Sequence, residues 1–251
     1  RARPAGRAGP LPPMIPWLAG DADFPPLELA RSHPNGLLCA GGDLAPERIL
    51  AAYRRGIFPW FSAGEPILWW SPDPRMVLFP SEIRISRSLK KTLRAGRYEI
   101  RLDSAFARVI TACAQTARLG QPGTWITSEM QRAYLRLHEL GWAHSVETWV
   151  PGENGDELVG GLYGLAIGQM FYGESMFSLR TDASKIAVAH LARFLGKHGF
   201  GMVDCQMRTA HLASLGAREI PRREFIERLN ALVKDAQPVR WPEQGAVTDW
   251  R

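Results

Sequence analysis

Two apolar runs near the middle of the chain predict a β-hairpin. Residues 158–166 and 170–177 are rich in apolar and aromatic side chains, and three residues separate them. Gly168 lies in this short connection and can adopt the positive φ that a tight turn requires. The pattern therefore predicts two neighbouring strands joined at Gly168.

A helix and a short strand are predicted directly after this hairpin. Apolar residues in 186–195 recur at helical spacing, and Gly196 follows them. Residues 200–203 are mostly apolar and lead into Asp204-Cys-Gln206, which is typical of a strand that ends in polar residues. The second part of the chain thus combines strands and helices.

The same reasoning places further elements along the rest of the chain. Asp103 is expected to cap a helix that ends at Gly120, because Asp is a favoured residue at helix starts. Periodicity and end signals predict further helices over residues 46–55 and 128–141 and one beginning at Pro221, and alternation predicts a strand over residues 145–150.

Composition shifts divide the chain into three segments. Residues 1–16 are expected to be a disordered extension, because their start is rich in Arg and Pro and poor in apolar residues. Pro72 and Pro74 indicate a domain boundary, which predicts a small domain over residues 17–73 and a larger one over 74–251.

The overall composition is that of a globular protein. The 251 residues are 45% hydrophobic and 22% charged, and no apolar stretch approaches the ~18 residues of a membrane-spanning helix. The start of the chain also lacks the apolar centre of a signal peptide, so we expect a cytoplasmic protein. Cys39, Cys113 and Cys205 are far apart, which predicts reduced thiols and no metal site.

A net charge of +6 raises the possibility of a polyanionic partner. Basic side chains concentrate between residues 83 and 98, which contain no acidic residue. If residues 86–95 are helical, several of these side chains share one face and could follow a phosphate backbone. A solvated basic face is an equally good interpretation. The basic residues are Arg84, Arg87, Lys90, Lys91, Arg94 and Arg97.

Asp204 and Gln206 form the first candidate catalytic group. The two-residue period of a strand places both on one face and Cys205 on the other. Side chains at a strand end can also simply cap neighbouring backbone groups. From spacing alone, that structural interpretation is favoured.

Glu174 is the acidic residue inside the second predicted strand of the hairpin. An unpaired buried carboxylate is costly, so Glu174 needs a partner, which could be a substrate group or a structural cation. The neighbouring Leu162, Phe171 and Met176 would be interpreted as core from the pattern alone. Trp60 could either pack in a core or stack on a base.

Nine ordered segments resemble the bacterial leucyl/phenylalanyl-tRNA-protein transferases. The resemblance runs from about residue 35 to residue 229, which is most of the chain. The segments are 35–38 (NGLL), 41–44 (GGDL), 56–61 (GIFPWF), 69–75 (WWSPDPR), 123–127 (GTWIT), 158–164 (LVGGLYG), 173–178 (GESMFS), 204–206 (DCQ) and 213–217 (ASLGA).

This resemblance implies a cytoplasmic enzyme, and nothing in the sequence indicates more than a monomer. Its activity would be transfer of Leu or Phe from aminoacyl-tRNA to the N-terminal Arg or Lys of a protein, which creates an N-degron. The implied fold class is α+β: a small N-terminal α/β domain, followed by a GCN5-related acetyltransferase-like (GNAT-like) domain with a mixed, mainly antiparallel sheet. Because an aminoacyl ester is already activated, no metal or other cofactor is expected.

The resemblance also assigns roles to individual residues. Asp204 and Gln206 would be catalytic, and Glu174 would lie in the aminoacyl pocket. Trp60 and Trp125 match the family's adenosine site, and Leu162, Phe171 and Met176, which lie near Glu174, would form an apolar pocket. From their charge and spacing, we assign tRNA binding to Arg84, Arg87, Lys90, Lys91 and Arg94.

Two other functions remain open at this stage. A CoA-dependent N-acetyltransferase would share the implied fold, but residues 178–185 (SLRTDASK) lack the glycines of the pyrophosphate-binding loop. A non-catalytic RNA-binding module could use the basic face, but it would leave Asp204, Gln206 and Glu174 unexplained.

Overall fold

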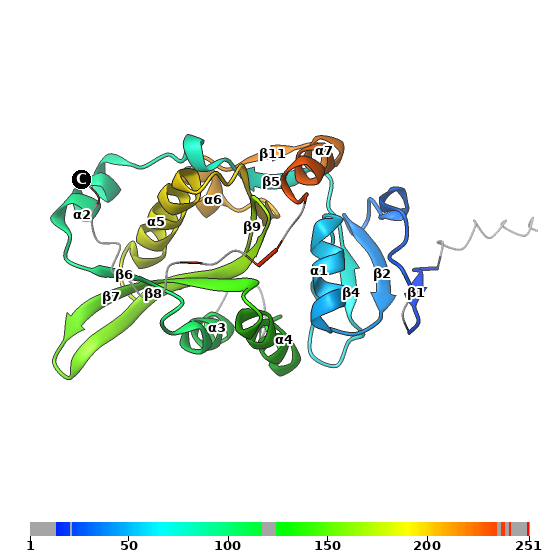
Figure 1. The fold of residues 1–251 in the computed structure, drawn as a ribbon, viewed down its shortest axis with the longest axis horizontal. Coiled ribbons are helices and arrows are strands. Elements are labelled where there is room, and N and C mark those ends of the chain that lie inside the picture. The colour runs from blue at the N-terminus through cyan, green and yellow to red at the C-terminus, as the bar shows by residue number, and fades with distance from the viewer. Residues whose placement is uncertain are drawn as a thin grey trace, which may run out of the picture.

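The chain folds into two β-sheets with helices packed around them (Figure 1). The computed structural model describes residues 14–20, 22–116, 124–234, 237–238, 241 and 250. Of the predicted extension over residues 1–16, residues 1–13 therefore lie outside the described part of the chain.

The smaller sheet has four strands in the order β1-β2-β4-β3. Strands β1 and β2 are parallel, and the other pairs are antiparallel. Helix α1 contacts both β3 and α4, so it connects this sheet to the rest of the molecule. The bounds are β1 (Trp17–Leu18), η1 (Leu27–Leu29), β2 (Leu37–Gly41), α1 (Pro46–Arg54), β3 (Phe58–Pro59) and β4 (Leu68–Trp70).

The larger sheet has seven strands in the order β11-β5-β10-β9-β8-β7-β6. Its only parallel pair, among the strands described, is β9 with β10. The strands are β5 (Arg75–Leu78), β6 (Glu99–Leu102), β7 (Ala143–Gly152), β8 (Gly155–Ile167), β9 (Met170–Ser178), β10 (Met202–Gln206) and β11 (Arg218–Ile220). A mixed α/β fold with mixed sheets is therefore confirmed.

Helices cover both faces of the larger sheet (Figure 1). Helices α3 and α4 contact one face, whereas α5 lies on the opposite face and connects the parallel strands β9 and β10. The helices are η2 (Pro80–Glu82), α2 (Arg87–Ala95), α3 (Phe106–Gln115), α4 (Ser128–Glu139), α5 (Ala183–Lys197), α6 (Ala210–Ser214) and α7 (Arg222–Leu232).

A gap opens in this sheet because β9 and β10 pair over only part of their length. The last pair in register is Tyr172 with Asp204, after which β9 continues along β8 to Ser178. Strand β10 is irregular between Asp204 and Gln206, where it pairs with β5. The ends of β9 and β10 therefore diverge, and this divergence positions the site described below.

The structure confirms most of the predicted elements. Strands β8 and β9 form the hairpin, and Gly168 adopts φ +58° at its turn. Helix α5 and strand β10 follow in the predicted order. The predicted cap of α3 is wrong, because Asp103 binds the backbone N–H of Ser145 while Glu147 accepts from the N–H of Ala105 at the helix start.

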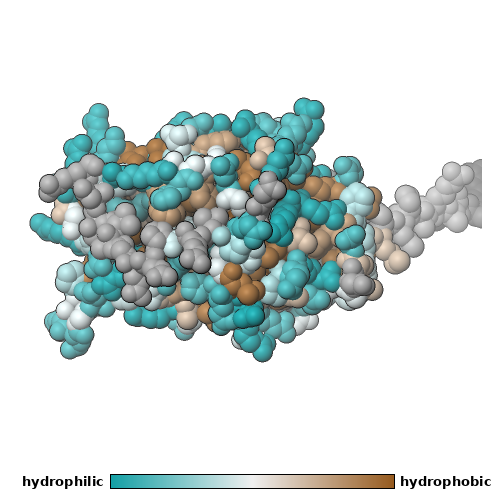
Figure 2. All heavy atoms as spheres, viewed as in Figure 1, coloured by the Kyte–Doolittle hydropathy of each residue, from teal (hydrophilic) through white to brown (hydrophobic). Residues whose placement is uncertain are grey.

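The surface seen in Figure 2 is mostly polar, with apolar residues in separate groups between charged and polar ones. Among the described residues, no helix combines the length and the apolar character needed to cross a membrane.

Candidate active site

A cavity of about 580 Å³ lies where β9 and β10 diverge, between the larger sheet and helices α5 and α6. Strand β3 of the smaller sheet also lines it, through Phe58 and Pro59. The predicted site residues that line the cavity are Trp60, Trp125, Leu162, Phe171, Glu174, Met176 and Gln206. Folding thus brings together side chains that are far apart in the sequence.

The inner part of the cavity is an apolar chamber between α5 and the sheet. Leu162 and Phe171 are 4% and 0% exposed, and Met176 is half-buried. Sequence reasoning missed the opposite wall, which α5 provides through Val188, Leu191 and Ala192. A chamber of this kind accepts an unbranched or aromatic apolar group and discriminates weakly by size.

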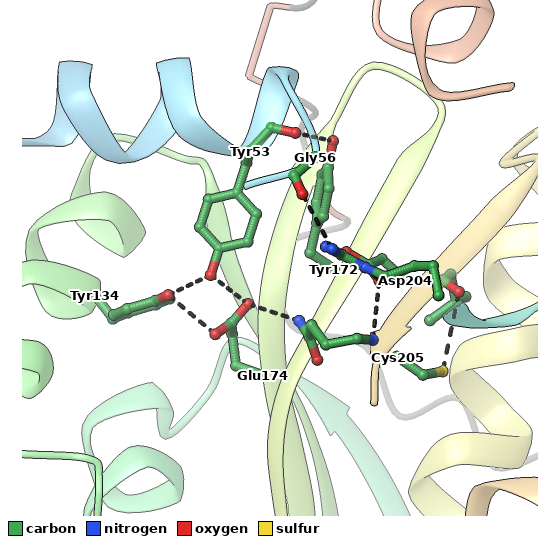
Figure 3. A network of polar contacts seen from close by, with 10 residues as sticks. Tyr53, Gly56, Tyr134, Tyr172, Glu174, Asp204 and Cys205 are labelled. Atoms are coloured by element: carbon green, nitrogen blue, oxygen red, sulfur yellow. Dashed lines mark hydrogen bonds and ion pairs between the residues drawn. The ribbon is translucent and has the colours of Figure 1, made fainter. Parts of the chain in front are cut away.

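Glu174 also lines the cavity and binds two tyrosines (Figure 3). Its carboxylate accepts hydrogen bonds from Tyr53 of α1 at 2.7 Å and Tyr134 of α4 at 3.0 Å. The two hydroxyls are also 2.6 Å from each other. Two helices from different parts of the chain therefore hold this carboxylate of β9 in place.

The environment of Glu174 changes its acidity. Burial raises the pKa of Glu174 from 4.5 to about 7, although the hydroxyls of Tyr53 and Tyr134 oppose the change by donating hydrogen bonds. Burial also raises the pKa of both tyrosines well above 10, so they remain donors. Near neutral pH, Glu174 can therefore exist with or without its proton.

This shift predicts that Glu174 makes stability depend on pH. Because its pKa is higher in the folded than in the unfolded chain, its stabilising effect is complete below pH 4.5 and is lost as the pH rises through about 7. Between pH 5 and pH 8.5, the unfolding free energy of wild type should therefore fall by up to about 3 kcal/mol relative to that of Glu174→Gln.

Urea unfolding at several pH values measures this difference. Glu153→Gln, at an exposed position in the β7–β8 turn, serves as the matched control and should follow the wild-type profile. Parallel profiles for wild type and Glu174→Gln would contradict the prediction.

Gln206 connects the carboxylate of Glu174 to the end of β10. Its Nε2 donates to Glu174 Oε1 at 3.4 Å, which leaves its carbonyl oxygen as the acceptor group. The backbone of Gln206 has φ +55°, which is unusual for a residue with a side chain. Its N–H donates to Asp204 Oδ1 at 2.9 Å, and this bond supports the strained conformation.

Asp204 is fully buried and is not among the described residues that line the cavity. Arg75 binds both of its oxygens, with Nε at 2.8 Å and Nη2 at 2.7 Å. Asp204 therefore contacts Gln206 through the backbone, and its charge is balanced by Arg75.

Arg75 makes further contacts within this buried polar group. Its Nη1 donates to the carbonyl of Gly56 at 3.0 Å. Its guanidinium also lies 4.8 Å from the ring centre of Phe58 and 4.6 Å from that of Phe225. One side chain thus joins the loop after α1, strand β10 and helix α7.

The two tryptophans of the predicted adenosine site line the same cavity. Trp60 and Trp125 are both half-buried, so each indole keeps an accessible surface. Trp70 packs edge-on against Trp60 at 5.5 Å and donates its indole N–H to the Trp60 carbonyl. Stacking on a ligand and packing in the core are therefore both possible for Trp60.

The predicted basic face lies outside this cavity. Helix α2 begins after Ser86, which caps it, and buries Leu89 and Leu93. The five basic side chains are exposed, and none forms an ion pair with a residue in the described part of the chain. These residues are Arg84, Arg87, Lys90, Lys91 and Arg94.

Tyr53, Tyr134 and Arg75 are site residues that sequence reasoning did not identify as functional. The tyrosines occupy apolar positions of amphipathic helices, so their pattern resembles ordinary core packing. Arg75 offered a better signal, because it is a charged residue at the start of β5, directly before the apolar residues 76–78.

Comparison with known sequences identifies the family. The sequence model described as "Leucyl/phenylalanyl-tRNA protein transferase" matches residues 77–230, and that of its N-terminal domain matches residues 42–73. A cavity that combines an apolar wall with a carboxylate and an amide is the kind of site that an acyl-transferring enzyme requires, and the chain is an aminoacyltransferase. It belongs to the leucyl/phenylalanyl-tRNA-protein transferase family.

Three relatives carry the name leucyl/phenylalanyl-tRNA–protein transferase. The protein from Azoarcus sp. (strain BH72) is 60% identical over 94% of this chain and 100% of its own length. The Nitrosomonas europaea protein is 64% identical over 87% of this chain and 91% of its own length. The Chromobacterium violaceum protein is 62% identical over 90% of this chain and 95% of its own length. The resemblance inferred from the nine motifs is confirmed.

Among solved structures, that of L-PGS from Bacillus licheniformis aligns at a TM-score of 0.35. The alignment has 12% identity and covers 73% of this chain and 61% of that chain. This similarity is too low to support an argument about fold or function.

Proposed function

We propose that this chain transfers Leu or Phe from aminoacyl-tRNA to the N-terminal Arg or Lys of acceptor proteins and so creates an N-degron. The observation that carries the proposal is the single cavity in which an apolar chamber, two accessible indoles, Glu174 and Gln206 meet. Family membership supports the same activity.

In this reaction the acceptor's α-amine attacks the carbonyl carbon of the aminoacyl ester. An amide bond forms, the bond between that carbon and the ribose oxygen breaks, the amine loses a proton, and the ribose oxygen gains one. The ester is already activated, so the enzyme mainly has to align both groups and accept the proton.

The cavity suggests how the donor binds. The Leu or Phe side chain would enter the apolar chamber, and the terminal adenosine would contact Trp60 and Trp125, where stacking contributes about 1–3 kcal/mol per base. Glu174, held by two tyrosine hydroxyls, would bind the donor's amino group or a ribose hydroxyl.

Gln206 and Asp204 have different proposed roles. The carbonyl oxygen of Gln206 accepts a hydrogen bond from the attacking amine, because its Nε2 already donates to Glu174. Asp204 does not contact the substrate and instead holds the backbone of Gln206 by accepting its N–H. Its ion pair with Arg75 keeps it from serving as a free base. This assignment refines the role that we predicted for Asp204 from the sequence.

The exposed basic side chains of α2 and Arg84 are proposed to bind tRNA phosphates. Replacing Lys90 and Lys91 by Gln should then reduce the slope of log affinity against log salt concentration by roughly 0.7–0.9 per lost contact. Binding of aminoacyl-tRNA titrated at several salt concentrations measures the slope.

Lys234→Gln is the control for this salt experiment. Lys234 is exposed after α7 and lies outside the proposed face, so this change should leave the slope near that of wild type. An unchanged slope in the Lys90/Lys91 variant would show that these side chains are only solvated and do not bind tRNA phosphates.

The proposed activity can be tested by transfer of labelled leucine from leucyl-tRNA to two peptides that begin with Arg or Ala. We expect labelling of the Arg peptide in a reaction without CoA. Acetyl transfer from acetyl-CoA instead would favour the acetyltransferase alternative, and tight tRNA binding with neither transfer would favour an RNA-binding module.

We also propose a domain organisation and a cellular setting. Residues 17–73 would form the N-terminal domain and residues 74–251 a GNAT-like domain, a division that the two separate sheets support. The crossover from β9 through α5 to the parallel β10 is the feature that favours the GNAT-like assignment. A cytoplasmic monomer without cofactors fits the proposed reaction.

A further inference from the structure

Trp241 lies after α7, beyond residues 77–230 that match the main family model, and is packed into the larger domain. It is 7% exposed and stacks on His144 of β7 at 4.4 Å with an angle of 5° between the rings. It also contacts Phe194 of α5 at 4.7 Å and Phe171 of β9 at 5.9 Å. The indole therefore fills the space between α5 and the sheet.

These contacts connect Trp241 to both walls of the apolar chamber. Phe171 belongs to the sheet wall, and Phe194 belongs to the helix whose Leu191 and Ala192 form the other wall. Phe171 pairs with Val203 where β9 and β10 are still in register, so it lies where the two strands still form a continuous wall. Trp241 is not among the described residues that line the cavity, and it contacts the chamber wall through Phe171.

The Phe171 ring is also restrained from a second side. A Cβ atom at Gly164 of β8 would lie only 2.7 Å from this ring, so the ring packs directly against the glycine backbone. With Gly164 on one side and Trp241 on another, Phe171 has little freedom to move away from the chamber.

We propose that Trp241 is a specificity-determining residue that sets the depth of the aminoacyl chamber through Phe171. It touches no substrate and acts by fixing Phe171 and the spacing between α5 and the sheet. The inference rests on the proposed function, because it assumes that the chamber holds the transferred side chain.

Removing the indole should change the relative use of the two donors. Trp241→Ala leaves space into which the Phe171 ring can move, which deepens the chamber. Phe is longer than Leu, so the deeper chamber should favour Phe and fit Leu less well. A difference of this kind in an apolar pocket changes relative kcat/KM by roughly 10-fold.

Trp250 offers a matched control within the same core. It packs on a second histidine, His190, at 5.1 Å and contacts Arg193 at 5.5 Å. Neither of these α5 residues is among the described residues that line the cavity. Trp250→Ala should therefore alter packing without altering the depth of the chamber.

The experiment supplies equal amounts of leucyl-tRNA and phenylalanyl-tRNA in one reaction and measures the ratio of Phe to Leu on an Arg peptide. This ratio equals the ratio of kcat/KM values and does not depend on how much enzyme is folded. We expect an increase of roughly 10-fold for Trp241→Ala, about 2- to 3-fold for Trp241→Phe, and no change for Trp250→Ala.

The outcomes separate this inference from the proposed function. If wild-type protein forms neither product, the proposed function is wrong and the inference falls with it. If wild type is active and Trp241→Ala shifts the ratio no more than Trp250→Ala does, the inference alone is overturned. Should Trp241→Ala fail to fold, an unchanged ratio in Trp241→Phe would overturn it equally.

Discussion

Replacing Gln206 by Ala is expected to lower kcat for aminoacyl transfer by about 10²–10³-fold. The carbonyl oxygen of Gln206 is the acceptor group that we place beside the attacking amine, and Ala removes it. Aminoacyl-tRNA affinity should change by no more than about threefold, because this contact is made to the acceptor and not to the tRNA. Single-turnover transfer and a separate binding titration measure the two quantities.

Two further variants sharpen this test. Gln169→Ala makes the same chemical change at an exposed position beside the β8–β9 turn, outside the residues that line the cavity, and should keep wild-type turnover. Asp204→Asn keeps an acceptor for the Gln206 N–H but removes the negative charge. If Asp204 only positions Gln206, Asp204→Asn should lose less turnover than Gln206→Ala.

An equal loss in Asp204→Asn and Gln206→Ala would instead make Asp204 a proton acceptor. Turnover of Gln206→Ala within about threefold of wild type would remove the catalytic assignment of Gln206 altogether.

The sequence predicted the local elements of this site because their signals are local. The hairpin of β8 and β9 follows from two apolar runs and one glycine, and α5 follows from helical spacing. The family motifs then selected Gln206 and Glu174 from many polar residues. What the sequence could not show is which distant side chains complete their environment.

Glu174 illustrates this limit. Its need for a partner was predicted from the cost of a buried carboxylate, and the alternatives were a substrate group or a structural cation. Its partners in the described structure are the hydroxyls of Tyr53, 121 residues away, and Tyr134, 40 residues away, together with the Gln206 amide. Helical spacing cannot distinguish such tyrosines from core residues.

The prediction that Asp103 caps α3 was wrong for a related reason. Asp103 and Glu147 are both acidic residues near the helix start, but β6 and β7 pair antiparallel and bring Glu147 to the N–H of Ala105. Asp103 turns to Ser145 and His144. The preference for an acidic side chain at a helix start was correct, but the pairing of β6 with β7 determines that Glu147 supplies it.

Removing one member of the buried Arg75–Asp204 pair is expected to have the largest effect on stability. Both side chains are 0% exposed, so Arg75→Met leaves the Asp204 carboxylate buried without its partner. Such a change typically destabilises by about 3–5 kcal/mol. It also removes the bond to the Gly56 carbonyl and the contacts with Phe58 and Phe225. Equilibrium urea unfolding measures the loss.

Arg136→Ala provides the matched control, because Arg136 forms an ion pair of 2.8 Å with Glu139 while both side chains are more than half exposed. An exposed pair of this kind contributes about 0–1 kcal/mol. A comparable loss in Arg136→Ala and Arg75→Met would contradict the role assigned to burial.

The double variant Arg75→Met/Asp204→Leu separates stability from function. With no charge left unpaired in the core, it should be more stable than either single variant, because apolar replacement of a buried pair is often close to neutral. Turnover should nevertheless stay low, since the Gln206 N–H has lost the oxygen that holds its φ of +55°. Recovered stability together with wild-type turnover would show that the pair has no part in positioning Gln206.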